Sequence, residues 1–336
     1  MSNLIAKAGF DTWTGHFVRR IRQRYNDQCV NVIAYHSISN RPSLLTAGTM
    51  LRHSPAEFER HLNYLAEHYS PISLRALVDA LATGDLPRRA LVITLDDGFA
   101  DSIRQAAPIL ARRRIPATIF PVTATIGNRD LLWQHKLTWL VSQGHEEKFF
   151  EAARGESYPI RKPGESAESF AREHYRADLP DLLESLLRRV GSSGSKLADE
   201  LRPYLDEEEI AQAEPELVEF GNHTHTHAIL AALAPDQLRR EIVTARDLLS
   251  SLTGRPPVAL AYPFGLKRHY NAESRRIAVE TGHRAALDSR RRVNGHDTDP
   301  FELSRKPAPT GSQLLFEQLI EDWPADISMP ARGGGA

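Results

Sequence analysis

Two clusters of polar residues follow apolar stretches of the sequence and could carry out chemistry. The first is Asp96-Asp97-Gly98, which comes directly after Leu91-Val-Ile-Thr-Leu95. Adjacent carboxylates repel each other, and the repulsion is relieved when they share a cation or a proton. The pair therefore indicates metal or acid–base chemistry. A plain turn is the competing interpretation, because Asp and Gly both tolerate turn geometry.

The second cluster is His223-Thr-His225-Thr-His227. In a helical turn His223 and His227 would share a face, whereas in an extended strand all three histidines would point the same way. Several imidazoles on one face favour a site for a first-row metal, and ordinary surface or core histidines are the competing interpretation. Which histidines would bind the metal depends on the local backbone. One carboxylate and two imidazoles give three ligands and leave a position for water, as in catalytic zinc sites. A second carboxylate can then move a proton, and this combination hydrolyses amides or esters.

The elements that must position these clusters are short β-rich runs alternating with helical patterns, which is typical of repeated β-α units around a parallel sheet. We expect an α/β fold, a distorted TIM-like (β/α) barrel of about seven strands, with both clusters at the carboxyl ends of strands. A helix is predicted over Pro235 to Leu252, ended by Gly254 and Pro256. The expected strands are Val30 to Tyr35, Ala90 to Leu95, Pro116 to Phe120, Leu217 to Gly221, Val258 to Tyr262 and His283 to Leu287.

The segment from about 127 to 215 is charged and helical in pattern, and we interpret it as an insertion into a barrel that spans 29–325. Its Trp133, Leu137, Trp139 and Leu140 could line a substrate groove, although such spacing is more typical of a core. Residues 1–28 are expected to form a helical extension, and 326–336 a disordered tail with almost nothing to bury.

Composition excludes several classes of protein. Forty-two Lys and Arg against 43 Asp and Glu leave a formal charge of -1 over 336 residues, so no basic field favours nucleic acid. Cys29 is the single cysteine, which excludes an internal disulfide and a cysteine-based metal site. Since the N-terminus lacks a signal-peptide pattern, a cytoplasmic location is expected. Residues 10–24 could form a basic amphipathic helix on a membrane surface, but packing on the domain is the favoured interpretation.

The two clusters also carry a family resemblance. Thr94-Leu-Asp-Asp-Gly98 resembles the T-F-D-D-G motif, and His223-Thr-His-Thr-His227 the H-[ST]-x-x-H motif, of NodB-like polysaccharide deacetylases, the family 4 carbohydrate esterases. Ile115-Pro-Ala-Thr-Ile-Phe120 and Ala261-Tyr-Pro-Phe-Gly265 are similar to further family segments. The resemblance covers roughly residues 30 to 125 and 216 to 310.

The resemblance implies removal of N-acetyl groups from N-acetylglucosamine units of an oligo- or polysaccharide, with release of acetate. Asp96 would be the general base. Asp97, His223 and His227 would hold one divalent metal, with zinc as the default and cobalt, nickel or iron also suited to these ligands. The backbone N–H of Phe264 would stabilise the oxyanion.

The chain departs from the family pattern at two places. Ala261 stands where the third motif has an arginine that tunes the base, and Arg305 and Lys306 are candidates to replace it. No L-x-H motif supplies the general acid. The ending Phe301-Glu-Leu-Ser-Arg-Lys306 and the pair Tyr35-His36 resemble an exopolysaccharide branch. His36 is the expected acid if the first strand closes the barrel, and a structural histidine at a strand end is the alternative.

Two other functions use the same residues. A non-haem iron oxygenase also binds metal with two histidines and a carboxylate. That class usually has a histidine two residues before the carboxylate, and Thr94 or Leu95 stands there. An inactive carbohydrate-binding relative is the other alternative, supported by the missing arginine and opposed by the intact metal ligands.

Overall fold

The computed structural model describes residues 29–46 and 51–321, so the expected N-terminal helix with its membrane face (10–24) and the tail 326–336 lie outside the described residues. Parallel strands form the centre of the fold, in the order β1, β5, β6, β7, β8, β9 and a last strand split into β10 and β11. Within the described chain no helix is long and apolar enough to cross a membrane. The strands are β1 (Asn31–Tyr35), β5 (Ala90–Asp97), β6 (Ala117–Pro121), β7 (Val218–Phe220), β8 (Ala259–Ala261), β9 (Ala285–Asp288), β10 (Leu303–Ser304) and β11 (Lys306–Pro307).

These strands close into a distorted barrel. A parallel bridge between Asn222 and Leu260 joins the end of β7 to β8, and β11 pairs with β1 through Ile33 and Lys306. Arg305 is the one residue between β10 and β11, and its N–H donates to the Asp288 carbonyl at 2.9 Å. The first and last strands are therefore neighbours, and the expected α/β barrel class is confirmed.

The strands are buried on both faces, as parallel strands covered by helices must be. All eight residues of β5 are buried, and its Thr94 hydroxyl donates to the Ile33 carbonyl of β1 at 3.0 Å. The six expected strands are each present, with ends displaced by at most two residues. Two short paired segments, β2 (Ser37–Ile38) with β3 (Arg52–His53), and β4 (Ser70–Pro71) beside β5, extend the rim and the edge.

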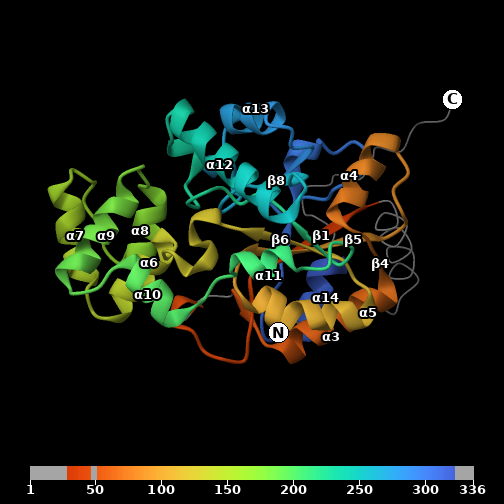
Figure 1. Cartoon of the computed structure of the whole chain (residues 1–336), viewed down its shortest axis with the longest axis horizontal. Coiled ribbons are helices and arrows are strands. Elements are labelled where there is room, and N and C mark those ends of the chain that lie inside the picture. The colour runs from red at the N-terminus through yellow and green to blue at the C-terminus, as the bar shows by residue number, and fades with distance from the viewer. Residues whose placement is uncertain (1–28, 47–50, 322–336) are drawn as a thin grey trace, which may run out of the picture.

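Helices cover the outside of the barrel (Figure 1). The predicted helix at Pro235 is α12 (Pro235–Thr253), which buries Leu238, Ile242, Ala245 and Leu249 and ends at Gly254 with φ +68°. The last helix, α14 (Gln313–Glu321), stacks Phe316 on His61 of α3 (Pro55–His68), with 3.7 Å between ring centroids. The other covering helices are α4 (Leu74–Thr83), α5 (Ala107–Arg113) and α13 (Ala272–Glu280).

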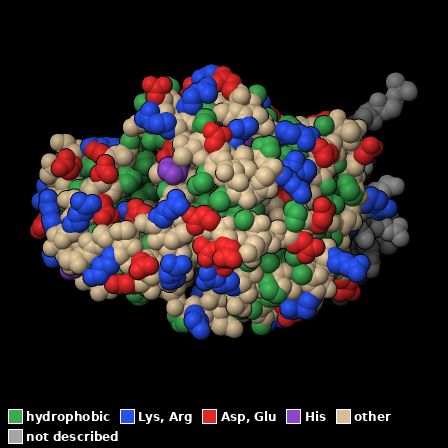
Figure 2. All heavy atoms as spheres, viewed as in Figure 1, with side chains coloured by type: hydrophobic (Ala, Val, Ile, Leu, Met, Phe, Trp, Pro, Cys, Tyr) green, Lys and Arg blue, Asp and Glu red, His purple; other side chains and the backbone are tan. Residues whose placement is uncertain are grey.

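Between β6 and β7 the chain forms a run of helices, most of which gather at the left of Figure 1 with their own hydrophobic cluster. Trp133, Leu137 and Leu140 are buried in that cluster, so the core interpretation of this stripe holds. Charged side chains of both signs are interspersed over the face in Figure 2, in line with the formal charge of -1. The helices are α6 (Trp133–Ser142), α7 (Glu146–Gly155), α8 (Ala167–Glu173), α9 (Leu179–Arg189), α10 (Gly194–Leu201) and α11 (Glu207–Ala211).

Candidate metal centre and active site

The carboxyl ends of the parallel strands bring the polar clusters together at one mouth of the barrel. Asp96 and Asp97 end β5, and both residues are 3% exposed. Asp97 has φ +67° and Gly98 φ +70°. A Cβ at Gly98 would lie 2.7 Å from the Pro121 Cβ, so only glycine lets this turn pack on β6. The turn aims both carboxylates into the barrel mouth.

The histidine loop after β7 is neither a helical turn nor a strand. Thr224 and His227 have φ +66° and +60°, and the His227 N–H donates to the Thr224 hydroxyl at 3.1 Å. Glu241 of α12 accepts from the N–H of His225 at 2.9 Å, which fixes the loop from outside. Such strained non-glycine residues persist where the surrounding contacts over-determine them, and they cluster at functional sites.

This backbone brings His223 and His227 together and turns His225 away. The His223 and His227 rings lie 4.8 Å apart, and their Nε2 atoms stand 3.6 and 3.5 Å from the Asp97 Oδ1. His225 instead places its Nδ1 2.9 Å from the Thr123 hydroxyl. The ligand atoms that converge are therefore those of His223 and His227, and His225 does not join them.

The Asp97, His223 and His227 atoms fit a divalent metal. Ligand atoms around a tetrahedral zinc with bonds of about 2.0–2.1 Å stand about 3.3 Å apart, close to the separations found here. The His223 Nδ1 lies 2.8 Å from the Ala261 carbonyl, so it donates there and leaves the Nε2 lone pair toward Asp97. Burial lowers the pKa of His223 and His227, so both are neutral, as metal ligands must be.

Gln134 of α6 supports the other histidine. Its side-chain amide lies 2.8 Å from the His227 Nδ1, while its Oε1 has no partner among the described residues. Rotating the amide by half a turn lets the oxygen accept from the Nδ1–H of His227 and frees Nε2 as a ligand. The Trp133 indole also donates to the His227 carbonyl at 3.0 Å. Sequence patterning assigned this helix to the core and gave no sign of the contact.

A second group of possible ligands lies in the helical segment, at Glu165, Glu173 and His174. Its residues are exposed or half-buried, and the Glu173 carboxylate already pairs with Lys162 at 2.9 Å. We therefore assign no metal there.

Arg305 takes the place of the arginine that the third motif lacks. Its guanidinium donates to the Asp96 Oδ1 at 2.6 Å, and both side chains are almost fully buried. Burial alone would raise the pKa of Asp96, but Arg305, His223 and His36 outweigh it and hold the pKa below its usual range. Lys306, the other candidate, donates to the Leu319 carbonyl of α14 at 3.1 Å.

Asp97 behaves differently from Asp96. Burial and the neighbouring Asp96 carboxylate raise the pKa of Asp97 to about 8. Without a cation, burial keeps such a carboxyl protonated. The positive charge of a bound metal ion would stabilise its ionised form and so lower its pKa. The two aspartates are therefore suited to different tasks, one as an ionised base and one as a ligand.

His36 lies at the end of β1, beside the last strand, as the barrel closure requires. Tyr35 of β1 is in register with Leu95 of β5, so the residues that follow them, His36 and Asp96, lie at the same mouth. Burial lowers the pKa of His36 to about 4. The imidazole is therefore neutral in the free protein and must receive a proton before it can donate one.

Phe264 heads a tight turn after β8. The Gly265 N–H donates to the Pro263 carbonyl at 2.7 Å, and Phe264 has φ +59°, so Pro263 to Gly265 form a strained γ-turn. Among the described residues the Phe264 N–H meets no acceptor. Its ring packs on His227 with centroids 4.8 Å apart, which keeps this N–H near the proposed metal ligands.

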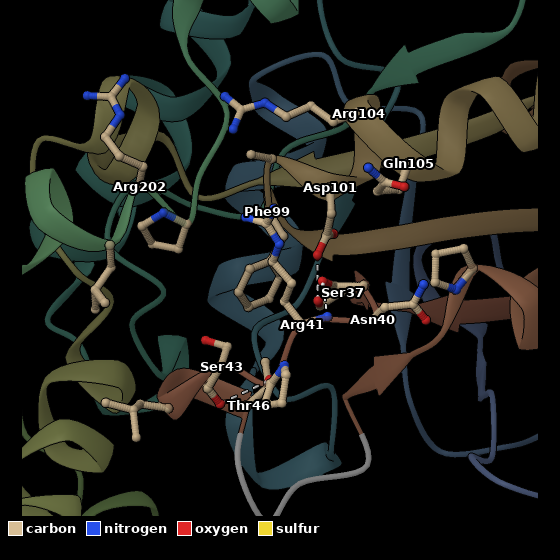
Figure 3. A pocket seen from close by; sticks show the side chains of 17 residues that line it. Ser37, Asn40, Arg41, Ser43, Thr46, Phe99, Asp101, Arg104, Gln105 and Arg202 are labelled. Atoms are coloured by element: carbon tan, nitrogen blue, oxygen red, sulfur yellow. Dashed lines mark hydrogen bonds between the residues drawn. The ribbon is translucent and has the colours of Figure 1, made fainter.

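A hollow beside the mouth is shown in Figure 3. It encloses about 650 Å³ between the segment after β2, the start of the helical turn at Ser102 and the segment after α10. The Asp101 carboxylate at its floor accepts from the Ser37 hydroxyl at 2.6 Å and the Ile38 N–H at 3.0 Å (Figure 3). These bonds tie the segment after β1 to the segment after β5 and so fix His36 relative to the two aspartates.

Comparison with known proteins gives a family match that spans the segments of this site. The profile of the polysaccharide deacetylase family matches residues 83–148 and 185–286, which include both aspartates, the histidine loop and Phe264. YxkH of Bacillus subtilis, itself assigned to the polysaccharide deacetylases, is 23% identical over 293 residues, 86% of this chain and 75% of its own.

Solved deacetylase structures have the same fold at low identity. The Streptococcus pyogenes deacetylase PplD in complex with acetate superposes with a TM-score of 0.57 at 18% identity, over 84% of this chain and 92% of its own. IcaB from Ammonifex degensii gives a TM-score of 0.57 at 17% identity, over 87% and 96%. The chain belongs to the polysaccharide deacetylase family, whose members are hydrolases that deacetylate polysaccharides.

Proposed function

We propose that this chain is a metal-dependent hydrolase that removes the N-acetyl group from N-acetylglucosamine units of an oligo- or polysaccharide. The observation that carries the proposal is the pairing of two unlike carboxylates. Asp97 converges with His223 and His227 on one point, while the adjacent Asp96 is held ionised by Arg305 at 2.6 Å. Acetate in the PplD structure is the product that this reaction would release.

Asp97, His223 and His227 would hold the metal, with zinc the default for this ligand set. When bound, such an ion lowers the pKa of a coordinated water and polarises the acetamide carbonyl. Asp96 removes a proton from the attacking water. The Phe264 N–H donates to the oxygen that becomes negative, a contribution of about 2.7–4 kcal/mol for one such fixed donor.

The leaving amine needs a proton, and His36 is the proposed donor. His36 is neutral in the free protein, so it has no proton of its own to give as an imidazolium. The proton that Asp96 removes from water can supply it. His36 and Asp96 follow paired positions of the neighbouring strands β1 and β5, and we propose that the proton passes to the imidazole and then to the amine.

The test separates the two aspartates. Purified protein loaded with zinc should release acetate from N-acetylglucosamine oligomers. Asp96→Asn should retain the metal and lose about 10²–10⁴-fold in turnover, the usual contribution of a general base. Asp97→Ala should lose both metal and turnover.

Equal metal loss in the two variants would refute this division of roles. Oxygen consumption with 2-oxoglutarate would support the oxygenase alternative, and saccharide binding without acetate release would support the inactive relative.

A further inference from the structure

A cavity of about 550 Å³ opens beside His36, within the range of about 300–1,000 Å³ typical of small-molecule sites. One wall is apolar and comes from Pro307 at the end of β11, Pro309 after it and Leu315 of α14. The other carries two arginines, Arg172 from α8 and Arg291 from the segment after β9. Three separate parts of the chain thus build one concave surface next to the proposed general acid.

The two arginines are exposed and have no acidic partner among the described residues. Within residues 29–46 and 51–321, neither Arg172 nor Arg291 makes an ion pair or a side-chain hydrogen bond. The carboxylate next to Arg172 in sequence, Glu173, pairs with Lys162 instead. Arg290, next to Arg291, is bound to Asp288 at 2.5 Å.

In the hollow of Figure 3, by comparison, Arg104 and Arg202 pair with Glu209 and Asp199, and Arg41 is the arginine of its lining with no ion pair among the described residues. Two uncompensated guanidinium groups in a concave site create a local positive potential that attracts anions. The cavity beside His36 therefore carries two such arginines together, on the side of the proposed general acid.

The arginines lie close to residues of the proposed active site. The Arg172 guanidinium lies over the Phe264 ring at 5.9 Å, and His36 itself lines the cavity. Arg291 has φ +59°, a strained conformation of the kind that marks functional segments. Since His36 protonates the departing amine, the sugar that carries this amine must lie on the His36 side of the metal. Its substituents and its neighbour in the polymer then reach the arginines.

We propose that this cavity binds a sugar unit bearing a carboxylate, so that the substrate is an acidic polysaccharide in which a uronic acid stands next to the N-acetylated sugar. The planar guanidinium matches a carboxylate in two parallel hydrogen bonds, and the apolar wall suits one face of a sugar ring. This inference rests on the proposed deacetylase function.

The test compares tetrasaccharides of equal length. The neutral probe is the N-acetylglucosamine tetramer, and the acidic probes are hyaluronan and heparosan tetrasaccharides, which alternate N-acetylglucosamine with glucuronate. We expect a higher kcat/KM for an acidic probe. Arg172→Gln and Arg291→Gln should each lower the acidic-to-neutral ratio by about fivefold, in line with one partly exposed ion pair. Arg172→Lys should restore part of it, and Arg240→Gln, an exposed arginine of α12, should change neither probe.

The ratio matters because Arg172 also contacts Phe264, so its loss can slow both probes together. A ratio that stays unchanged in the Arg172→Gln/Arg291→Gln double variant would overturn the inference while leaving the deacetylase function intact.

If no probe releases acetate, the proposed function fails, and binding still tests the cavity. The affinity of the catalytically impaired Asp96→Asn protein for the acidic tetrasaccharides, measured by calorimetry, should fall at least tenfold when both arginines are replaced. Equal affinities with and without the arginines would contradict the assignment.

Discussion

Replacing Arg305 with methionine tests whether the last strand sets the state of the catalytic base. Methionine fills much of the same space without the charge, so the Asp96 carboxylate would stay buried without its partner at 2.6 Å. The side chains of this ion pair are 2% and 4% exposed, so water cannot replace the lost bond. Burial then dominates and raises the pKa of Asp96.

The expected cost is large. Removing one member of a buried ion pair leaves an uncompensated charge and costs about 3–5 kcal/mol. In the native protein the folded pKa of Asp96 is depressed, so its stabilisation is fully present above the unfolded value of about 3.9 and disappears as the pH falls through the folded pKa. The difference in stability between variant and wild type should therefore be large at pH 7, begin to shrink as the pH falls through the raised pKa of Asp96 in the variant, and shrink further as the pH falls through the depressed pKa of the wild type.

Two measurements check this expectation. Urea unfolding at pH 4 and pH 7 gives the stability difference. The pH dependence of kcat/KM on N-acetylglucosamine oligomers should show its acidic limb moved upward, and each pH unit corresponds to about 1.4 kcal/mol.

Arg89→Met is the matched control, because Arg89 pairs with Glu321 at 2.7 Å at the opposite end of β5. Arg89→Met should lower the stability without moving the acidic limb of the pH profile of kcat/KM. An Arg305→Met protein whose limb stays at the wild-type pH would refute the claim that this arginine tunes the base.

Three further predictions concern the metal and the acid. Because the pKa of metal-free Asp97 is about 8, zinc affinity should rise about tenfold per pH unit up to that value, and a flat affinity in competition titrations from pH 6 to 8 would contradict its role as a ligand. Gln134→Ala should weaken zinc binding by about 10–100-fold, the usual effect of losing a partner of a ligating histidine, whereas Gln143→Ala beyond the end of α6 should not. His36→Ala should keep the metal, cut amide hydrolysis by about 10²–10⁴-fold and spare an activated ester whose leaving group needs no proton, and amide hydrolysis at the wild-type rate would place the acid elsewhere.

Much of the barrel was predictable because buried parallel strands are continuous apolar runs. Ala90 to Leu95 is such a run, and the structure extends it only to Asp97. The last strand was missed, since Ser304, Arg305 and Lys306 are polar and periodicity alone does not indicate their burial. Their charges are satisfied by Asp96 and by helix carbonyls that lie close only after folding.

The candidate site was predictable in composition but not in geometry. Residue type and spacing pointed to one carboxylate and two of the three histidines, and the family resemblance implied Asp97, His223 and His227. The loop that brings the two histidines together depends on left-handed residues that no periodicity reveals. Gln134 was missed for a related reason. A glutamine in an amphipathic helix has no signature of its own, and its contact with His227 arises from the packing of α6 against the barrel mouth.

The position of Arg305 has a consequence for synthesis of the protein. Ribosomes deliver a chain from the N-terminus, and folding of emerging segments can begin before the rest is made. A nascent chain that ends at Glu302 already contains every other residue assigned to the site, from His36 to Phe264. It still lacks the segment that seals the seam between β9 and β1 and the cation that Asp96 needs. The site is therefore completed only when the few residues that close the barrel have been synthesised.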